Sequence, residues 1–97
     1  MRCEELSSIM GIISNTRDLL REEREVWQAE LDAMENRYQR EVRGNNLSDE
    51  ERERLERRMG EVQQLLKYYN RALFGMEETW SNLEAGKMYL DKLSFNS

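Results

Sequence analysis

The sequence predicts an all-α fold, a long antiparallel helical hairpin whose two arms pack in a coiled-coil-like manner. The first observation is composition: 97 residues contain no proline and five glycines, and they are rich in Glu, Arg, Leu, Gln and Met, which favour long helices. The second is a helical spacing of apolar residues in two stretches, and the third is one turn signal between them. We expect one domain, residues 1–97, with a helix over about 3–43, a turn over 44–47 and a helix over about 48–93.

The first stretch is an amphipathic helix with two interruptions. One heptad position holds Leu6, Ile13, Leu20, Trp27, Met34 and Glu41, and its companion holds Met10, Arg17, Arg24, Leu31 and Tyr38. Eight of these eleven positions are apolar, as the seam of a coiled coil requires. Arg17 and Arg24 interrupt the seam. Either their stems cover it while the guanidinium groups reach a glutamate or stack on Tyr68, Tyr69 or Phe74, or they set the register and select the partner.

The turn is marked by a helix stop followed directly by a helix start. Gly44, Asn45 and Asn46 tolerate the left-handed backbone found at helix C-termini. Ser48 and Glu51 then form a capping-box pattern, in which the serine oxygen accepts from the amide three residues on and the glutamate reaches back. We therefore expect α-helix, tight turn and capped α-helix in succession.

The second stretch keeps an alternating spacing of four and three residues over five heptads, from Leu55 to Leu90. This period predicts a supercoil against a partner helix, which the short turn makes the first arm, running antiparallel. Position i should then lie opposite roughly 91 minus i, as an estimate from hairpin geometry. The predicted hairpin core is Leu6, Ile13, Leu20, Trp27, Leu31, Met34, Leu55, Met59, Val62, Leu66, Tyr69, Leu73, Met76, Trp80 and Leu83.

Glycines inside the arms leave an alternative fold open. Each costs about 1 kcal/mol against alanine in a helix interior. Gly75 divides the second arm near its middle, so a three-helix bundle broken near Gly75 is the alternative to the hairpin.

Composition also narrows the function. The chain has no histidine and a single cysteine, Cys3, which excludes Ser-His-Asp triads, HExxH zinc sites and internal disulfides and favours a reducing compartment. A net charge of −5 disfavours binding to nucleic acid or to anionic membranes. We find no membrane span, signal peptide or nucleotide-binding loop. We therefore expect a cytoplasmic protein that is not an enzyme, with no cofactor, metal or small-molecule substrate.

An asymmetry along the chain gives the main functional clue. Residues 62–97 hold eight charged side chains but six of the eight aromatic ones. One facing helix cannot cover most of these apolar side chains. Tyr, Trp, Phe and Met are residue types that are enriched at interface centres. The predicted partner-binding residues are Leu65, Tyr68, Ala72, Phe74, Met88, Tyr89, Leu93 and Phe95.

These observations favour a protein–protein interaction module, an acidic adaptor or chaperone-like protein that binds a partner helix. A chain this small, with neither disulfide nor metal, gains stability by association. Either two hairpins form a homodimeric four-helix bundle, or one hairpin takes a helix from another protein in a hetero-complex. Two other functions stay open: a structural protein that assembles into scaffolds, and an acidic inhibitor that occupies a basic groove.

Overall fold

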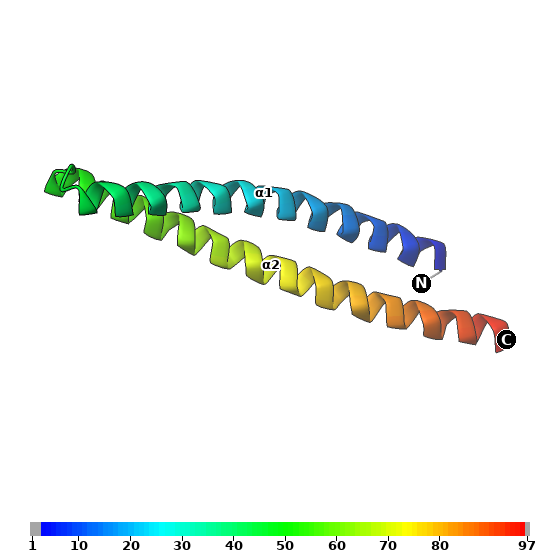
Figure 1. Cartoon of the computed structure of the whole chain (residues 1–97). Coiled ribbons are helices and arrows are strands. Elements are labelled where there is room, and N and C mark those ends of the chain that lie inside the picture. Colours follow the sequence, from blue (N-terminus) through cyan, green and yellow to red (C-terminus); the bar gives the residue numbers. More distant parts are fainter. Residues whose placement is uncertain (1–2, 97) are drawn as a thin grey trace. The chain divides into compact units, whose positions relative to one another are not determined.

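The computed structural model describes residues 3–96, with side chains as far as residue 94. This part of the chain contains two helices and no strand: α1, Cys3–Arg43, and α2, Asp49–Asn96, which are coloured blue to green and green to red in Figure 1. The predicted all-α helical hairpin is confirmed. Its association into a four-helix bundle stays a prediction.

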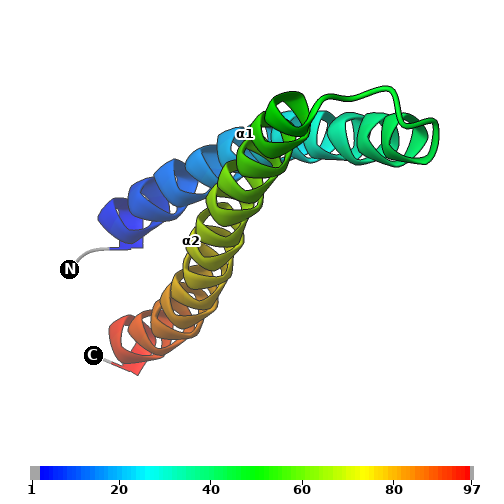
Figure 2. The ribbon, with the colours of Figure 1, turned by 90° about the vertical axis from the view of Figure 1, so that its left-hand side faces the viewer.

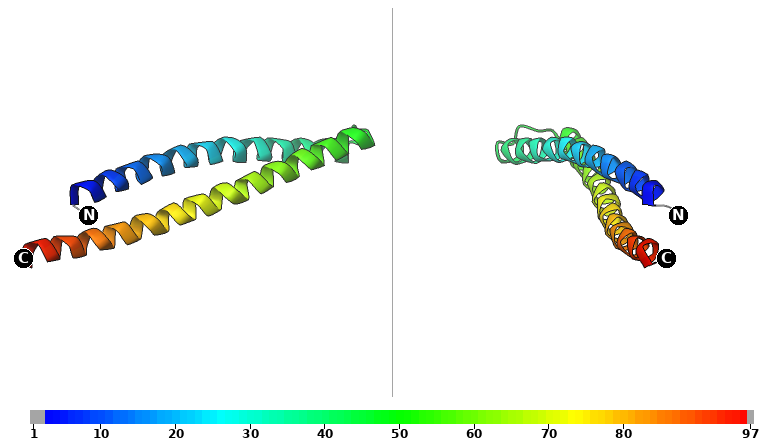
Figure 3. Two further views of the ribbon diagram at one scale, coloured as in Figure 1. Left: turned by 180° about the vertical axis from the view of Figure 1, so that it is seen from behind. Right: turned by 90° about the vertical axis from the view of Figure 1, so that its right-hand side faces the viewer.

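The alternative with a break near Gly75 is wrong. α2 is continuous through this residue, and both views in Figure 3 show it as one uninterrupted ribbon. No glycine in the described residues has a positive φ. A helical glycine costs only about 1 kcal/mol, and the adjacent Leu73 is buried, so a break here would sacrifice both backbone hydrogen bonds and packing.

Contacts group the chain into two compact units. Unit 1 comprises Met1–Arg21 with Arg71–Ser97, and unit 2 comprises Glu22–Asn70. Each unit therefore contains a segment of α1 and a segment of α2. The organisation as a single domain stays a prediction of the sequence.

In unit 2, α1 ends in a Schellman motif centred on Asn45. The amide of Asn46 donates to the carbonyl of Glu41 over 2.9 Å, and the amide of Asn45 donates to that of Val42 over 3.2 Å. Asn45 takes the left-handed conformation, with φ at 55°, although the preceding Gly44 would adopt it at lower cost. A Cβ at Gly44 would lie 2.7 Å from Nδ2 of the Asn46 side chain, which would have to move, and 3.3 Å from the Arg40 carbonyl oxygen. Figure 2 shows the open loop that follows.

Ser48 caps the start of α2. Its hydroxyl oxygen accepts from the Glu51 amide over 3.2 Å, as predicted, and its carbonyl accepts from the Arg52 amide. The carboxylate of Glu51 takes its hydrogen bond from the Ser48 hydroxyl, also over 3.2 Å. Three acidic side chains follow in the first turn of α2, where they interact favourably with the positive end of the helix dipole.

The core of unit 2 joins the two helices through Leu31 of α1 and Val62 and Leu66 of α2, all buried. Trp27, Met34 and Met59 pack around them and are partly buried. In unit 1 the buried apolar residues are Leu6, Met10 and Leu73. Of the fifteen predicted core residues, six are buried and nine are half-buried. Many half-buried positions are expected where a helix has one neighbour in its unit.

The contacts between the helices depart from the expected register by about one helical turn, in either direction. In unit 1 the Cys3 thiol donates to Asp91 Oδ1 over 2.9 Å, where the estimate places residue 88. Likewise, in unit 2 the Tyr38 hydroxyl donates to Glu56 over 2.6 Å, where the estimate places residue 53. In the opposite direction, Arg58 lies 3.3 Å from Glu30 in unit 2, where the estimate places residue 61.

Candidate interaction surfaces

Most of the predicted partner-binding residues are exposed. In unit 1, Phe74, Met88, Tyr89 and Leu93 have exposed fractions of 64, 60, 66 and 68 %, and Ala72 is also exposed. In unit 2, Tyr68 is exposed and Leu65 is half-buried. The side chain of Phe95 lies outside the described residues.

These residues do not share one side of α2. At 100° per residue, Phe74 and Met88 lie two heptads apart on one stripe, which is heptad position b when Leu73 is position a. Ala72, Tyr89 and Leu93 lie on the other side of the helix, at positions g and c. The single apolar surface predicted from composition therefore separates into two.

An ion pair shows how the two helices of unit 1 are oriented. Arg21 Nη2 lies 2.7 Å from Glu77 Oε1, and both residues occupy heptad position e. The e positions of α1 and α2 therefore border one side of the helix pair, and their g positions border the opposite side. Phe74 and Met88 lie next to the e side of α2, whereas Tyr89 and Leu93 lie on the g side.

Apart from Glu5, at position c in the first turn of α1, the g side of unit 1 carries no charged residue in the described part of either helix, and we call its positions beyond Glu5 the uncharged face. Its members at positions c and g are Ile9, Ile12, Thr16 and Leu19 of α1 and Ala72, Gly75, Thr79, Asn82, Gly86, Tyr89 and Leu93 of α2. Ile12 and Leu19 are 65 and 64 % exposed. Sequence analysis did not select these two, although the seven-residue repeat Ile12, Leu19, Val26 could have revealed them.

The e side of unit 1 is polar and contains a shallow groove between the helices. Met10 and Ser14 of α1 and Trp80 and Lys87 of α2 are among the residues that line it. The indole nitrogen of Trp80 donates to Glu84 Oε2 over 3.1 Å. The groove therefore combines an apolar floor with charged edges of both signs.

The two seam arginines have partners other than those predicted. The Arg17 guanidinium lies 5.8 Å from the centre of the Trp80 ring, and Arg24 Nη1 donates to Asn70 Oδ1 over 3.3 Å. For Arg17 the predicted stacking on Tyr68, Tyr69 or Phe74 is wrong, and the alternative that the two arginines set the register stays a prediction. Arg17 Nε is buried without a hydrogen-bond partner and lies 3.7 Å from Asp18 Oδ1.

Unit 2 is dominated by polar contacts near the turn. The Arg58 guanidinium lies 5.6 Å from the centre of the Trp27 ring and 3.3 Å from Glu30 Oε1. The hydrogen bond from Tyr38 to Glu56 raises the pKa of the phenol, because ionisation would place two negative charges together. These contacts fasten α1 to α2.

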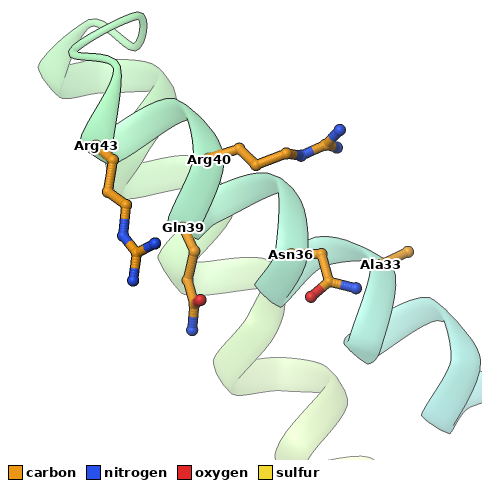
Figure 4. Close-up of a pocket in the computed structure, with 5 residues that line it drawn as sticks. All are labelled: Ala33, Asn36, Gln39, Arg40 and Arg43. Atoms are coloured by element: carbon orange, nitrogen blue, oxygen red, sulfur yellow. The ribbon is translucent and has the colours of Figure 1, made fainter.

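A shallow polar surface near the end of α1 is lined by Ala33, Asn36, Gln39, Arg40 and Arg43. Figure 4 shows that these side chains spread apart, with Gln39 and Arg43 pointing one way and Arg40 another. They do not converge on one point, as the polar groups of a small-molecule site do. Within the described residues, no three metal-ligating side chains come together.

The thiol of Cys3 donates a hydrogen bond to a carboxylate. Its hydrogen bond to Asp91 raises the pKa of the thiol, with smaller contributions from desolvation and from the charge of Asp91. A raised pKa lowers the thiolate fraction at neutral pH, which is the opposite of an activated nucleophile.

Comparison of this chain with protein-family models, with curated proteins and with solved structures finds no match. Neither helix, over the residues described, has an apolar segment long enough to cross a bilayer. The functional argument therefore depends on the surfaces described above.

Proposed function

We propose that this chain is a non-enzymatic protein–protein interaction module, an adaptor or chaperone-like protein that binds a helix of another protein. The observation that carries the proposal is the exposure of Phe74 and Met88 on one stripe of α2. The two side chains lie about 21 Å apart along the helix, and aromatic residues and Met are enriched at interaction sites. Cys3 as the sole cysteine supports action in the reducing cytoplasm.

The groove on the same side suits an amphipathic helix. Phe74 and Met88 flank the e side, where Met10 and Trp80 contribute apolar surface to the groove. Lys87 and Glu84 at its edge offer both signs of charge. A helix with apolar residues at i, i+3 or i+4, and i+7 would cover this surface, while its polar residues meet the charged edge.

The test compares three forms of the full-length chain: wild type, Phe74→Glu and Val26→Glu. Val26 is a matched control, since it is 61 % exposed but belongs to α1 in unit 2. Each tagged form is incubated with lysate of the source cells, and a protein retained in stoichiometric amount is identified, purified and titrated by calorimetry. We expect wild type and Val26→Glu to bind alike and Phe74→Glu to bind at least about tenfold more weakly, because burying an aromatic side chain contributes roughly 2 kcal/mol.

Two outcomes would contradict the proposal. One is that no protein is retained in stoichiometric amount by the wild-type chain. The other is equal affinity for all three forms, which would show that Phe74 lies outside the binding surface. Circular dichroism of each form checks that helicity is preserved.

A further inference from the structure

The uncharged face of unit 1 contains glycines that packing within the unit does not require. A Cβ at Gly75 or at Gly86 would have no atom within 4 Å apart from the local backbone. Glycine costs about 1 kcal/mol against alanine in a helix interior. A second helix that approaches closely from outside would give both glycines a role, since small residues let helix backbones come together. Gly11 and Gly60, which lie off this face, are not explained in this way.

Along α2, the uncharged face is nearly symmetric about Thr79. In an isologous pair of antiparallel helices, residues equally far from the two-fold axis lie opposite each other. With the axis at Thr79, Ala72 lies opposite Gly86, and Gly75 lies within one residue of Asn82. By sequence spacing, Leu65 would lie opposite Leu93, and Tyr68 would lie within one residue of the position opposite Tyr89. Leu and Tyr therefore recur in the same order in both directions, while the positions between them hold residues without bulky apolar side chains.

Along α1, the centre of symmetry is Thr16 for the pair Ile12 and Leu19, whereas Ile9 comes opposite Glu23. Ile12 and Leu19, both well exposed, lie on either side of it and come opposite each other to within one residue. The hydroxyl of Thr16 already donates to the carbonyl of Ile12 over 2.8 Å, so its burial leaves no donor unpaired. A second copy could thus cover this part of the face without a polar penalty.

The two centres of symmetry lie at the same level of unit 1. Arg17, which follows Thr16, stacks over Trp80, which follows Thr79. The contact between Cys3 and Asp91 gives the same register to within about one turn. One two-fold axis can therefore pass through both threonines and relate both helices to their copies at once.

The chain as a whole exposes more surface than a compact monomer of its mass. The chain exposes 7491 Å², whereas a folded monomer of 11.7 kDa typically exposes about 5,900 Å². The surplus of about 1,600 Å² is twice the roughly 800 Å² that each partner buries in a standard interface.

We propose that a second copy of this chain covers the uncharged face. α1 packs on α1 and α2 on α2, each pair antiparallel about a two-fold axis through Thr16 and Thr79. This interface lies on the opposite side of unit 1 from Phe74 and does not depend on the proposed function. The dimer leaves the e side available to another protein.

The first experiment compares neighbouring substitutions with similar exposure. Tyr89→Glu places a charge on the uncharged face, and Met88→Glu places one on the opposite side of the same helix. Leu19→Glu repeats the test on α1. By sedimentation equilibrium, we expect wild type and Met88→Glu to be dimers and the other two to be monomers, with circular dichroism confirming that all remain helical.

The second experiment tests the axis. In a Cys3→Ser background, a spin label is attached through Glu78→Cys or through Lys92→Cys, both of which lie off the face. An axis through Thr79 leaves the two labels at position 78 near each other but separates those at position 92 by about 40 Å, at 1.5 Å per residue. An axis parallel to the helices would instead give similar short distances at both positions.

The proposal is overturned by a monomeric wild-type chain, by a dimer that persists in both Tyr89→Glu and Leu19→Glu, or by equal label distances. None of these three results bears on whether another protein binds the surface around Phe74. A monomer that still binds a partner helix would refute the dimer and leave the proposed function intact. A dimer that binds no other protein would support the dimer and refute the proposed function.

Discussion

Substitution of Leu73 by alanine tests the packing of α2 on α1 in unit 1. Leu73 is 4 % exposed, whereas the adjacent Phe74 is 64 % exposed. Leu73→Ala removes three buried carbon groups, which at about 0.8 kcal/mol each amounts to about 2.4 kcal/mol. The cavity that remains raises the loss to about 3 kcal/mol. Phe74→Ala removes more atoms but from solvent, so its effect on the free energy of unfolding should stay within about 0.5 kcal/mol.

The assay is thermal and urea unfolding followed by circular dichroism at 222 nm. A loss of about 3 kcal/mol lowers the Tm by roughly 12–20 °C in a domain of this size. All forms are compared at one protein concentration, because association couples stability to concentration. The reasoning is refuted if Leu73→Ala unfolds within about 0.5 kcal/mol of wild type, or if Phe74→Ala is the more destabilised of the two.

Three further predictions concern the turn and the thiol. Asn45→Gly should stabilise the chain by about 0.5–1 kcal/mol in urea unfolding, because glycine adopts the φ of 55° without steric cost; no gain or a loss would contradict this. Ser48→Ala should cost about 1 kcal/mol by removing the acceptor of the Glu51 amide, and unchanged stability would show that the cap is dispensable. Asp91→Asn should accelerate alkylation of Cys3 by iodoacetamide at pH 8, because losing the carboxylate lowers the thiol pKa and raises the thiolate fraction; an equal or slower rate would count against it.

The helices and their ends could be predicted because they are determined by local sequence. The heptad pattern, the stop at Gly44 to Asn46 and the cap at Ser48 each act within a few residues. Local sequence did not determine that Asn45 would be the residue in the left-handed conformation. Sequence placed the left-handed backbone somewhere in Gly44 to Asn46, but the contact between a Gly44 Cβ and Asn46 is visible only in three dimensions.

The contacts between helices were harder to predict, because they depend on the register. The Arg17 guanidinium lies over Trp80, six residues beyond the position expected opposite it. The candidate surface was also incomplete. Composition drew attention to the aromatic end of α2, whereas Ile12 and Leu19 on α1 are aliphatic and became evident from their exposure.

The central claim is that the apolar surface exposed by a single chain is covered by other helices in solution. Its most direct test is the molar mass of the wild-type chain, measured by sedimentation equilibrium from low to high micromolar concentration. We expect twice the chain mass of 11.7 kDa, with strong helicity and no growth beyond the closed dimer. A fully helical chain that stays at the monomer mass at every concentration would contradict the claim.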